Sequence, residues 1–338
     1  MNMNIAIVGA TGNVGRKIIE ILEKKNFPVS ELFLIASAKS AGKKINFKGE
    51  DHTVIDLEKF DFSKVKIAFF AAGSAIAEKW ATEAAKKTIV IDNSKFFRKD
   101  PDIPLVVPEV NSKELAHVKN KNIIANANCS VIPLVVALKP LHDLYNIKRI
   151  IVSTYQSVSG AGKAPMDELL SQTQDFFNNK NLESKYFTKQ IAFNAIPHID
   201  SFLESGYTKE EQKTTDEVKK ILDKKIKITS TCVRIPVLVS HSISANVEFS
   251  KKYNIKEIRN VLSTSPGCKV IDELKDGGYI TPAEAENKFD TFISRIRQDE
   301  SQANTVNMWI VSDNLLKGAA LNAVEIAESL VEKDLYGK

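Results

Sequence analysis

The stretch Asn4-Ile-Ala-Ile-Val-Gly9-Ala-Thr-Gly12-Asn-Val-Gly15 decides the fold of the first half of the chain. A short apolar run leads directly into three spaced glycines, and apolar residues at positions 14, 18, 21 and 22 follow at helical spacing. Glycines at such a turn let the backbone approach a pyrophosphate, whose charge is attracted by the N–H groups at the helix N-terminus. The G-x-x-G-x-x-G spacing is one residue longer than the G-x-G-x-x-G fingerprint, and a plain strand-to-helix turn is the alternative. As the first unit of an alternating pattern, the stretch favours nucleotide binding.

Short apolar runs and helical patterns alternate through the rest of the first half, which is typical of a parallel sheet covered by crossover helices. Strands are expected at residues 4–8, 32–36, 65–71, 89–92 and 123–125, and further helical segments at 76–84 and 115–118. The pattern predicts an α/β, doubly wound domain of the Rossmann type.

From about residue 147 the chain changes to longer strands separated by turns, which predicts a second, α+β domain with a largely antiparallel sheet. Strands are expected at 149–157, 226–239, 242–249, 291–297 and 307–311, with helices at 165–178 and 209–225. Residues 315–338 return to a helical pattern, and a final helix of this kind often packs on the first domain. The expected domains are therefore 1–128 plus 315–338, and 129–314.

Composition excludes several classes of protein. The chain has 338 residues and a formal net charge of +5, spread along its length, which is too weak to indicate a nucleic-acid partner but suits a site for small anions. Its three cysteines allow neither a disulfide framework nor a zinc pattern, so we expect no metal site and a reducing, cytoplasmic location. The apolar runs are far shorter than the roughly 20 residues of a membrane span, and no basic-then-apolar leader is seen.

The segment after the second strand indicates which dinucleotide is bound. An acid there would hold the ribose 2′-hydroxyl of NAD and repel a 2′-phosphate. Residues 32–45 contain no acid, but they do contain Ser37, Lys39, Ser40 and Lys43. Hydroxyls and lysines favour NADP, although a solvated loop would also explain the lysines.

Cys129 lies directly after a strand and at the threshold of a helix that Asn128 or Ser130 can cap. A helix N-terminus stabilises a thiolate, and its N–H groups could also meet an oxyanion. The alternative is a small buried core residue, which is the interpretation we give to Cys232 and Cys268. The position of Cys129 at the carboxyl edge of the predicted parallel sheet favours a nucleophile.

A cysteine nucleophile needs a proton-transfer partner, and His241 is the candidate among five histidines. It falls on a short connection between two predicted strands and opens the second of them, whereas His52, His117 and His142 have surface or helix-end explanations. In the preceding strand Arg234 projects to the face opposite Thr231 and Val233, where a guanidinium suits a carboxylate or phosphate ligand. A surface ion pair is the alternative for this arginine.

These residues carry a family resemblance that spans the chain. The matching segments are GATGNVGRK at 9–17, ASAKSAGK at 36–43, DNSKFFR at 92–98, VPEVN at 107–111, NANCS at 126–130, STYQSVSGAG at 153–162, AFNAIPHID at 192–200, CVRIPV at 232–237 and SDNLLKGAA at 312–320. On these segments the chain resembles the aspartate-semialdehyde dehydrogenases of the bacterial type. It departs from them at Ala127, where relatives commonly carry proline, and in a short stretch at 177–187.

The resemblance implies the reversible, NADPH-dependent conversion of L-aspartyl 4-phosphate to L-aspartate 4-semialdehyde, a step toward lysine, threonine and methionine, in a homodimer or a tetramer. It implies that Cys129 forms an acyl-thioester, that His241 is the acid/base, and that Gln156 orients the substrate. It places the substrate carboxylate on Arg234, the substrate amino group on Glu210, and phosphate on Arg98, Asn128 and Lys213. The implied cofactor residues are Gly9, Thr11, Gly12, Asn13, Val14, Ser37, Lys39, Ser40, Ser159, Gly160 and Asn314.

Two other functions remain open at this point. An N-acetyl-glutamyl-phosphate reductase would share the glycine turn, the cysteine and the histidine, although the NANCS, CVRIP and SDNLL segments favour the semialdehyde dehydrogenase. A catalytically silent dinucleotide-binding scaffold is the other alternative. The presence of Cys129, Gln156, Arg234 and His241 argues against silence.

Overall fold

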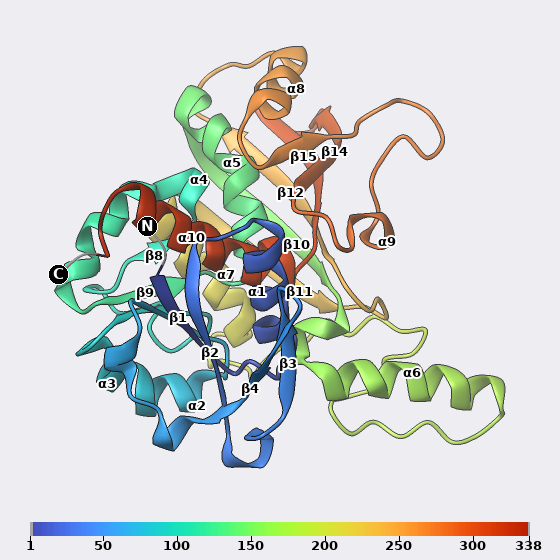
Figure 1. Cartoon of the computed structure of the whole chain (residues 1–338). Helices are drawn as coiled ribbons and strands as arrows, with labels where there is room; N and C mark the ends of the chain where they lie inside the picture. The colour runs from blue at the N-terminus through green and yellow to red at the C-terminus, as the bar shows by residue number, and fades with distance from the viewer. Residues whose placement is uncertain (1–2, 337–338) are drawn as a thin grey trace. The chain divides into compact units, whose positions relative to one another are not determined.

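The computed structural model describes residues 3–336 and divides into two compact units (Figure 1). The first unit contains the residues up to Ala127 and those from Ala319 on, and the second is Asn128–Gly318. Each is built on its own sheet, with seven strands in the first unit and six in the second.

The sheet of the first unit is parallel throughout and has the order β5-β2-β1-β6-β7-β9-β8. Its strands are β1 (Met3–Val8), β2 (Val29–Ala36), β5 (Ile55–Asp56), β6 (Ile67–Phe70), β7 (Ile89–Asp92), β8 (Leu105–Val106) and β9 (Ile123–Asn126). The hairpin β3 (Lys44–Phe47) and β4 (Glu50–Thr53) lies outside this sheet. The predicted doubly wound α/β domain is therefore confirmed, with all five expected strands in place.

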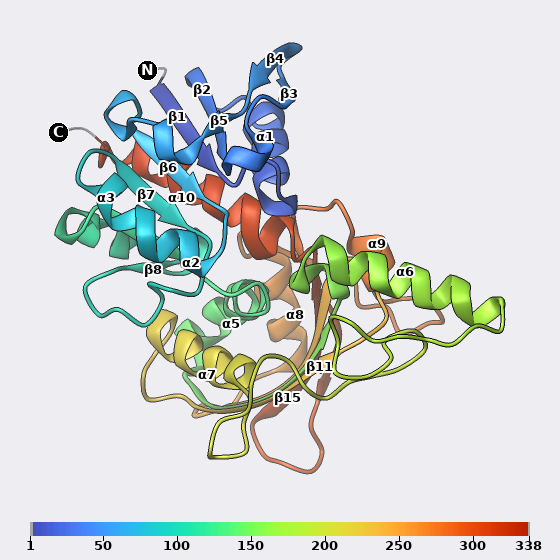
Figure 2. The ribbon, with the colours of Figure 1, turned by 90° about the horizontal axis from the view of Figure 1, so that it is seen from below.

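Helices cover both faces of this sheet, as the doubly wound strand order requires. They are α1 (Asn13–Lys24), α2 (Ser74–Ile76), a π turn (Ala77–Ala81), α3 (Thr82–Ala85), α4 (Pro108–Asn111), a 3₁₀ segment (Ser112–Asn120) and α10 (Leu321–Glu332). The last helix, α10, contacts α1 and β7 (Figure 2). Asn322 of α10 donates to Oδ1 of Asn126 at 2.6 Å, which ties the chain end to the end of β9.

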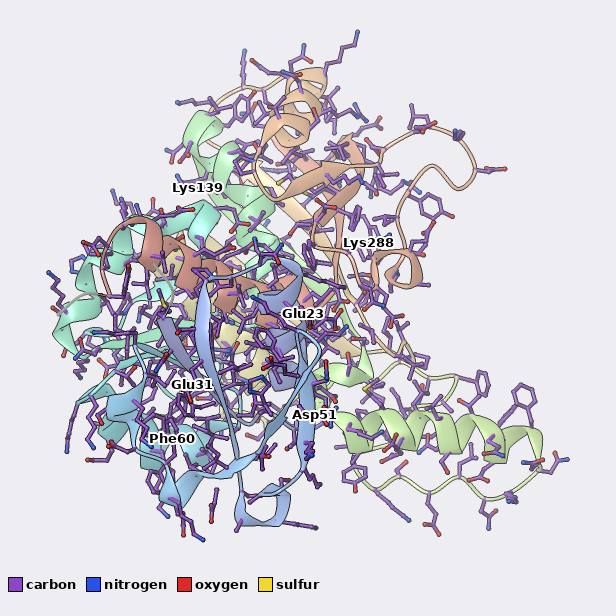
Figure 3. The ribbon with its side chains drawn as sticks, in the orientation of Figure 1. Glu23, Glu31, Asp51, Phe60, Lys139 and Lys288 are labelled. Carbon is purple, nitrogen blue, oxygen red and sulfur yellow. The ribbon has the colours of Figure 1, made fainter. Side chains whose placement is uncertain are left out.

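The first unit has a dense core because its central strands are buried on both faces. An aromatic row extends this core: the ring centroid of Phe60, labelled in Figure 3, lies 5.2 Å from those of Phe33 and Phe62. Phe62 in turn stacks on Phe70 of β6. The row anchors the loop between β5 and β6 to the sheet.

The second unit contains a six-stranded sheet with the order β11-β10-β12-β15-β14-β13. Its strands are β10 (Ile147–Gln156), β11 (Lys227–Arg234), β12 (His241–Phe249), β13 (Cys268–Val270), β14 (Thr291–Gln298) and β15 (Thr305–Ser312). The central pairs are antiparallel, but β10–β11 and β13–β14 are parallel, so the sheet is mixed. The strand expected at 226–239 ends at Arg234, and irregular chain follows it.

The helices of the second unit are α5 (Val131–Tyr145), α6 (Lys163–Phe177), α7 (Lys209–Ile221), α8 (Ile255–Thr264) and α9 (Pro282–Ala285). The sheet is contacted by α5, α7 and α8, and residues 131–138 of α5 are all buried. In Figures 1 and 2, α6 and the chain after it form an arm that extends beyond the sheet of this unit. A capping box of Thr208 and Glu211 starts α7, which ends at Ile221 rather than at the expected residue 225.

Among residues 3–336, no helix is both long and apolar enough to cross a membrane. The same residues contain no group of three or more histidine, cysteine, aspartate or glutamate side chains that could hold a metal ion.

Candidate active site

Asn128, Cys129 and Ser130 form the turn that leads into α5. Asn128 organises it: its Oδ1 accepts the N–H of Ser130 at 2.8 Å, and its carbonyl oxygen accepts the N–H groups of Val131 and Ile132. Pro133, the third residue of the helix, has no N–H. The N–H groups of Ser130, Val131 and Ile132 are therefore bonded to Asn128 and not to the sulfur of Cys129. The helix can still favour a thiolate through its dipole.

The sulfur of Cys129 lies 3.3 Å from Nε2 of His241, although 112 positions separate the two residues. His241 is 1% exposed and is the first residue of β12, paired with Ser312 of β15. It opens the strand that follows the predicted connection, so the sheet itself fixes its position. A thiol within reach of an imidazole is the arrangement required for nucleophilic catalysis.

The environment of His241 disfavours its charged form. Burial and the nearby Arg234 lower the pKa of His241 to about 3, against a smaller opposite effect of Glu210. The ring is therefore neutral at physiological pH. Its other nitrogen, Nδ1, accepts the main-chain N–H of Ser157 at 3.0 Å.

Arg234, at the end of β11, is 6% exposed, which excludes a surface ion pair. Its Nη1 donates to the carbonyl oxygen of Ser157. Burial lowers the pKa of Arg234, and the charges of Glu210 and Cys129 partly offset this effect. Gly160 is packed against this group, because a Cβ there would lie 3.1 Å from Nε2 of His241 and 3.2 Å from Nη1 of Arg234. A side chain at position 160 would fill the space beside both groups.

Glu210, in the first turn of α7, joins the remaining predicted residues of this unit. Its Oε1 accepts the side-chain amides of Asn128 at 2.9 Å and Gln156 at 3.3 Å, and its Oε2 accepts Lys213 at 2.7 Å. Burial alone would raise the pKa of Glu210, but Lys213 and the two amides outweigh it and lower the pKa to about 2. The carboxylate is ionised, and Lys213, which also binds Asp200 at 2.9 Å, is charged, with its pKa raised by these two acids despite burial.

Sequence reasoning missed three residues of this cluster. Glu217 accepts the main-chain N–H of Asn128 at 2.6 Å and so holds the cysteine turn against α7. Its spacing of seven residues from Glu210 on one helix face was the available signal. Asp200 and Ser157 belong to the matched segments but had no assigned role. Cys232 is buried, which raises its pKa to about 12, so the core interpretation of this cysteine is sound.

The glycine-rich turn lies in the first unit and allows only glycine at two points. A Cβ at Gly15 would lie 2.2 Å from the carbonyl oxygen of Gly9. A Cβ at Gly9, whose φ is +88°, would lie 2.6 Å from the carbonyl oxygen of Ala71. The following helix, α1, begins with Gly12 as its N-cap and has no side-chain cap. Thr11, Asn13 and Val14 therefore surround a helix N-terminus of the kind that binds a pyrophosphate.

The segment after β2 forms a 3₁₀ turn, Ala38–Ser40, with Ser37 as its N-cap. Ser37 and Lys39 are exposed, and Ser40 is half-buried. One acid lies beside the end of β2, because β5 pairs with β2 and places Asp56 opposite Ala36. The Asp56 carboxylate accepts the N–H of Glu58 at 3.3 Å and so caps the 3₁₀ turn that follows.

Arg98 also belongs to the first unit, where it is 9% exposed and donates to the carbonyl oxygens of Asn126 at 2.9 Å and Asn93 at 3.1 Å. Ser159 and Asn314 belong to the second unit, where their side chains bond each other at 3.0 Å. The second unit thus brings together ten predicted residues: Asn128, Cys129, Gln156, Ser159, Gly160, Glu210, Lys213, Arg234, His241 and Asn314.

Comparison with known proteins places this arrangement in a family. Residues 4–118 match the NAD binding domain of semialdehyde dehydrogenase, and residues 138–317 match the semialdehyde dehydrogenase dimerisation domain. The chain belongs to the semialdehyde dehydrogenase family.

The similar proteins within that family are aspartate-semialdehyde dehydrogenases. The enzyme from Aquifex aeolicus is 49% identical over 99% of this chain and 100% of its own length. The enzyme from Rickettsia bellii is 48% identical over 97% of this chain and 98% of its own length. The crystal structure of aspartate semialdehyde dehydrogenase II from Vibrio cholerae, complexed with ASA, has a TM-score of 0.96 at 46% identity and covers 98% of this chain and 99% of that one. These relatives favour the semialdehyde dehydrogenase over the acetyl-glutamyl-phosphate reductase and the silent scaffold.

Proposed function

We propose that this chain catalyses the reversible, NADPH-dependent reductive dephosphorylation of L-aspartyl 4-phosphate to L-aspartate 4-semialdehyde, with Cys129 as the nucleophile. The observation that carries the proposal is the 3.3 Å contact between the Cys129 sulfur and Nε2 of His241, beside the buried charged side chains of Arg234 and Glu210. The biosynthesis of lysine, threonine and methionine is the corresponding pathway.

The surroundings of Cys129 favour its thiolate. The dipole of α5 and the positive charge of Arg234 both stabilise negative charge at the sulfur. Attack on the acyl phosphate forms an acyl-thioester and expels phosphate, which divides one difficult step into two easier ones. His241 is the acid/base partner of these steps. Gln156, which is 2% exposed and held by Thr154, orients the substrate.

Fixed charges of both signs suit an amino-acid substrate. Arg234 binds the α-carboxylate, and the ionised Glu210 receives the amino group. Lys213, Asn128 and Arg98 bind the phosphate that leaves or attacks. Because the charges are preorganised, they stabilise the transition state without reorganising during the reaction.

The residues of the glycine turn fit a dinucleotide, since the close approach of Gly15 to Gly9 leaves the start of α1 open. Gly9, Thr11, Gly12, Asn13 and Val14 would hold the pyrophosphate, and Ser37, Lys39 and Ser40 the 2′-phosphate of NADP. Ser159, Gly160 and Asn314 would contact the nicotinamide end. The bound cofactor supplies or accepts the hydride.

We assign dinucleotide binding to residues 1–128 plus 315–338, and catalysis and dimerisation to 129–314. A homodimer, alone or paired into a tetramer, is supported by the outer face of the six-stranded sheet, which carries the Tyr155 and Trp309 rings, 5.3 Å apart. A cavity of about 340 Å³ on this face is lined by Ser244, Arg295 and Trp309, among others. Light scattering coupled to gel filtration tests the dimer. We place the enzyme in the cytoplasm.

The decisive experiment follows NADP reduction in the presence of phosphate with either aspartate semialdehyde or N-acetyl-glutamate semialdehyde. We expect turnover with the first and little with the second. The same assay with NAD measures cofactor preference. Preferential turnover of the acetylated substrate would overturn the proposed substrate.

A further inference from the structure

Lys213 of α7 is held between two carboxylates. Its Nζ lies 2.7 Å from Oε2 of Glu210 and 2.9 Å from Oδ2 of Asp200, and its side chain is 15% exposed. Burial lowers the pKa of Lys213, but Glu210 and then Asp200 raise it more, so its ammonium group is charged. The proposed function uses Lys213 for phosphate and Glu210 for the substrate amino group, and it gives Asp200 no role.

Asp200 reaches Lys213 because the chain before α7 folds back on the start of that helix. The carbonyl oxygen of Ser201 accepts the N–H of Lys209, the first residue of α7, at 2.8 Å. Asp200 has a φ of +67°, a conformation that aspartate and asparagine adopt more readily than most residues. Its Oδ1 accepts the N–H of Ser201 at 2.9 Å, and its other oxygen, Oδ2, contacts Lys213.

The two oxygens of Glu210 differ in what they already bind. Oε1 accepts the side-chain amides of Asn128 at 2.9 Å and Gln156 at 3.3 Å, which occupies both of its lone pairs. Oε2 accepts Lys213 at 2.7 Å. A substrate ammonium that binds Glu210 must therefore share Oε2 with Lys213.

Two further buried acids of α7 are engaged by the main chain. Glu211 accepts two main-chain N–H groups, and Glu217 accepts that of Asn128. Lys213 is thus paired with Glu210 and Asp200, and these three side chains together carry one negative charge. A phosphate that approaches Lys213 in the absence of substrate meets this excess of negative charge.

The substrate amino group reverses that condition. Its positive charge makes the cluster neutral, and two ammonium groups that share one carboxylate oxygen repel each other. A phosphate that binds beside both cations relieves the repulsion, because the anion is attracted to each of them. The amino group and phosphate should therefore strengthen each other's binding.

We propose that Asp200 and Glu210 make phosphate binding at Lys213 depend on the substrate amino group, and that Asp200 is the residue that weakens phosphate binding to the empty site. The inference rests on the proposed function and leaves its cysteine and histidine chemistry unchanged. Asp200 is then a specificity-determining residue, because it disfavours phosphate when the bound ligand has no α-amino group. By linkage, phosphate strengthens the binding of the amino acid by the same factor.

Two small acids that differ only in the amino group test this dependence. L-2-Aminobutyrate has the carboxylate for Arg234 and the ammonium for Glu210, whereas butyrate has the carboxylate alone. Calorimetry measures the dissociation constant of inorganic phosphate with each acid at saturation, and bound NADP keeps phosphate out of the dinucleotide site. We expect phosphate to bind at least about fivefold more tightly with aminobutyrate, the lower end of typical coupling between sites. Equal dissociation constants would overturn the proposal.

Asp200→Asn tests the role of the acid itself. Asparagine accepts the positive φ and can still accept the N–H of Ser201, but it has no charge. We expect the phosphate dissociation constant with butyrate to fall about fivefold, the upper end for a partly exposed ion pair. In the semialdehyde assay KM for phosphate should also fall, with little change in KM for the semialdehyde. A purely structural role predicts phosphate constants that rise or stay the same, and either result would refute the role of Asp200.

Glu204→Gln is the matched control, because Glu204 is an exposed acid of the same segment and the substitution changes the net charge equally. It should leave both phosphate constants unchanged. An equal gain in phosphate affinity in Glu204→Gln and Asp200→Asn would indicate a general charge effect and overturn the assignment to Asp200.

Failure of this inference is distinguishable from failure of the proposed function. Turnover of aspartate semialdehyde without the difference between aminobutyrate and butyrate refutes the inference alone. Absence of that turnover refutes the proposed function. Inhibition of the turnover by L-2-aminobutyrate is measured first, and its absence would overturn the assignment of Arg234 and Glu210 to the substrate, on which the inference depends.

Discussion

Replacing Glu210 by glutamine removes one charge from the centre of the site while conserving shape. Glu210 is 6% exposed, and its Oε2 binds Lys213 at 2.7 Å. The folded protein lowers the pKa of this carboxyl from 4.5 to about 2. One pKa unit corresponds to about 1.4 kcal/mol, so the ionised carboxylate contributes roughly 3 kcal/mol to the free energy of unfolding. Removing one partner of a buried ion pair costs a similar amount.

The sign of the pH dependence follows from the lowered pKa. The stabilisation is fully present above the unfolded value of 4.5 and is lost as the pH falls through about 2, where the folded protein also takes up the proton. At pH 7 we therefore expect Glu210→Gln to be about 3 kcal/mol less stable than the wild type. The difference between the two proteins should shrink as the pH falls from 4.5 toward 2.

Urea unfolding of both proteins, followed by circular dichroism across this pH range, measures the difference. Glu204→Gln is the control, because Glu204 is an exposed acid close in sequence, and it should leave stability unchanged. Equal stability of Glu210→Gln and wild type at pH 7 would refute the reasoning. So would a difference that stays constant down to pH 2, since it would come from packing and not from charge.

Three further predictions concern the dinucleotide turn and the cysteines. Gly15→Ala should abolish NADP binding measured by calorimetry, because its Cβ would lie 2.2 Å from the carbonyl oxygen of Gly9. In Gly12→Ala the new Cβ would lie 3.4 Å from the same oxygen, so the melting temperature of this variant should stay near that of the wild type. Lys39→Ala should raise KM for NADP about fivefold with little change for NAD, as expected for loss of one exposed charge contact; equal changes for both cofactors would remove Lys39 from the 2′-phosphate site. Iodoacetamide at pH 8 should label Cys129 well before Cys232, whose pKa burial raises to about 12, and peptide mass spectrometry would show the reverse order if this is wrong.

The fold was predictable where hydrophobic periodicity was strong. All five expected strands of the parallel sheet are present, because each is an apolar run buried on both faces. The two-residue strands β5 and β8 were missed, since two residues carry no periodic signal. The strand predicted to 239 stops at Arg234, because its ladder partner Gln156 is the last residue of β10 and Pro236, which has no N–H, follows two residues later.

The contacts within the site were harder to predict from the sequence, because residues far apart in the chain come together only when the second unit folds. Cys129 and His241 could be singled out by their positions beside elements, but their contact spans 112 positions and depends on how α5, which follows Cys129, packs against β12. The use of helix N–H groups by Asn128 could not be foreseen, since Asn128 and Ser130 are equally plausible caps. Glu217 and Ser157 act through main-chain N–H groups, which leave no trace in residue type.

A single-turnover experiment tests the central claim, that Cys129 carries the acyl group. Enzyme is mixed with aspartate semialdehyde and NADP without phosphate, so the thioester forms but cannot be released to phosphate. The account predicts a rapid burst of NADPH stoichiometric with active sites, and an aspartyl group on the peptide that contains Cys129 in the mass spectrum. Absence of the burst, or an adduct on Cys232 or Cys268 in place of Cys129, would contradict it.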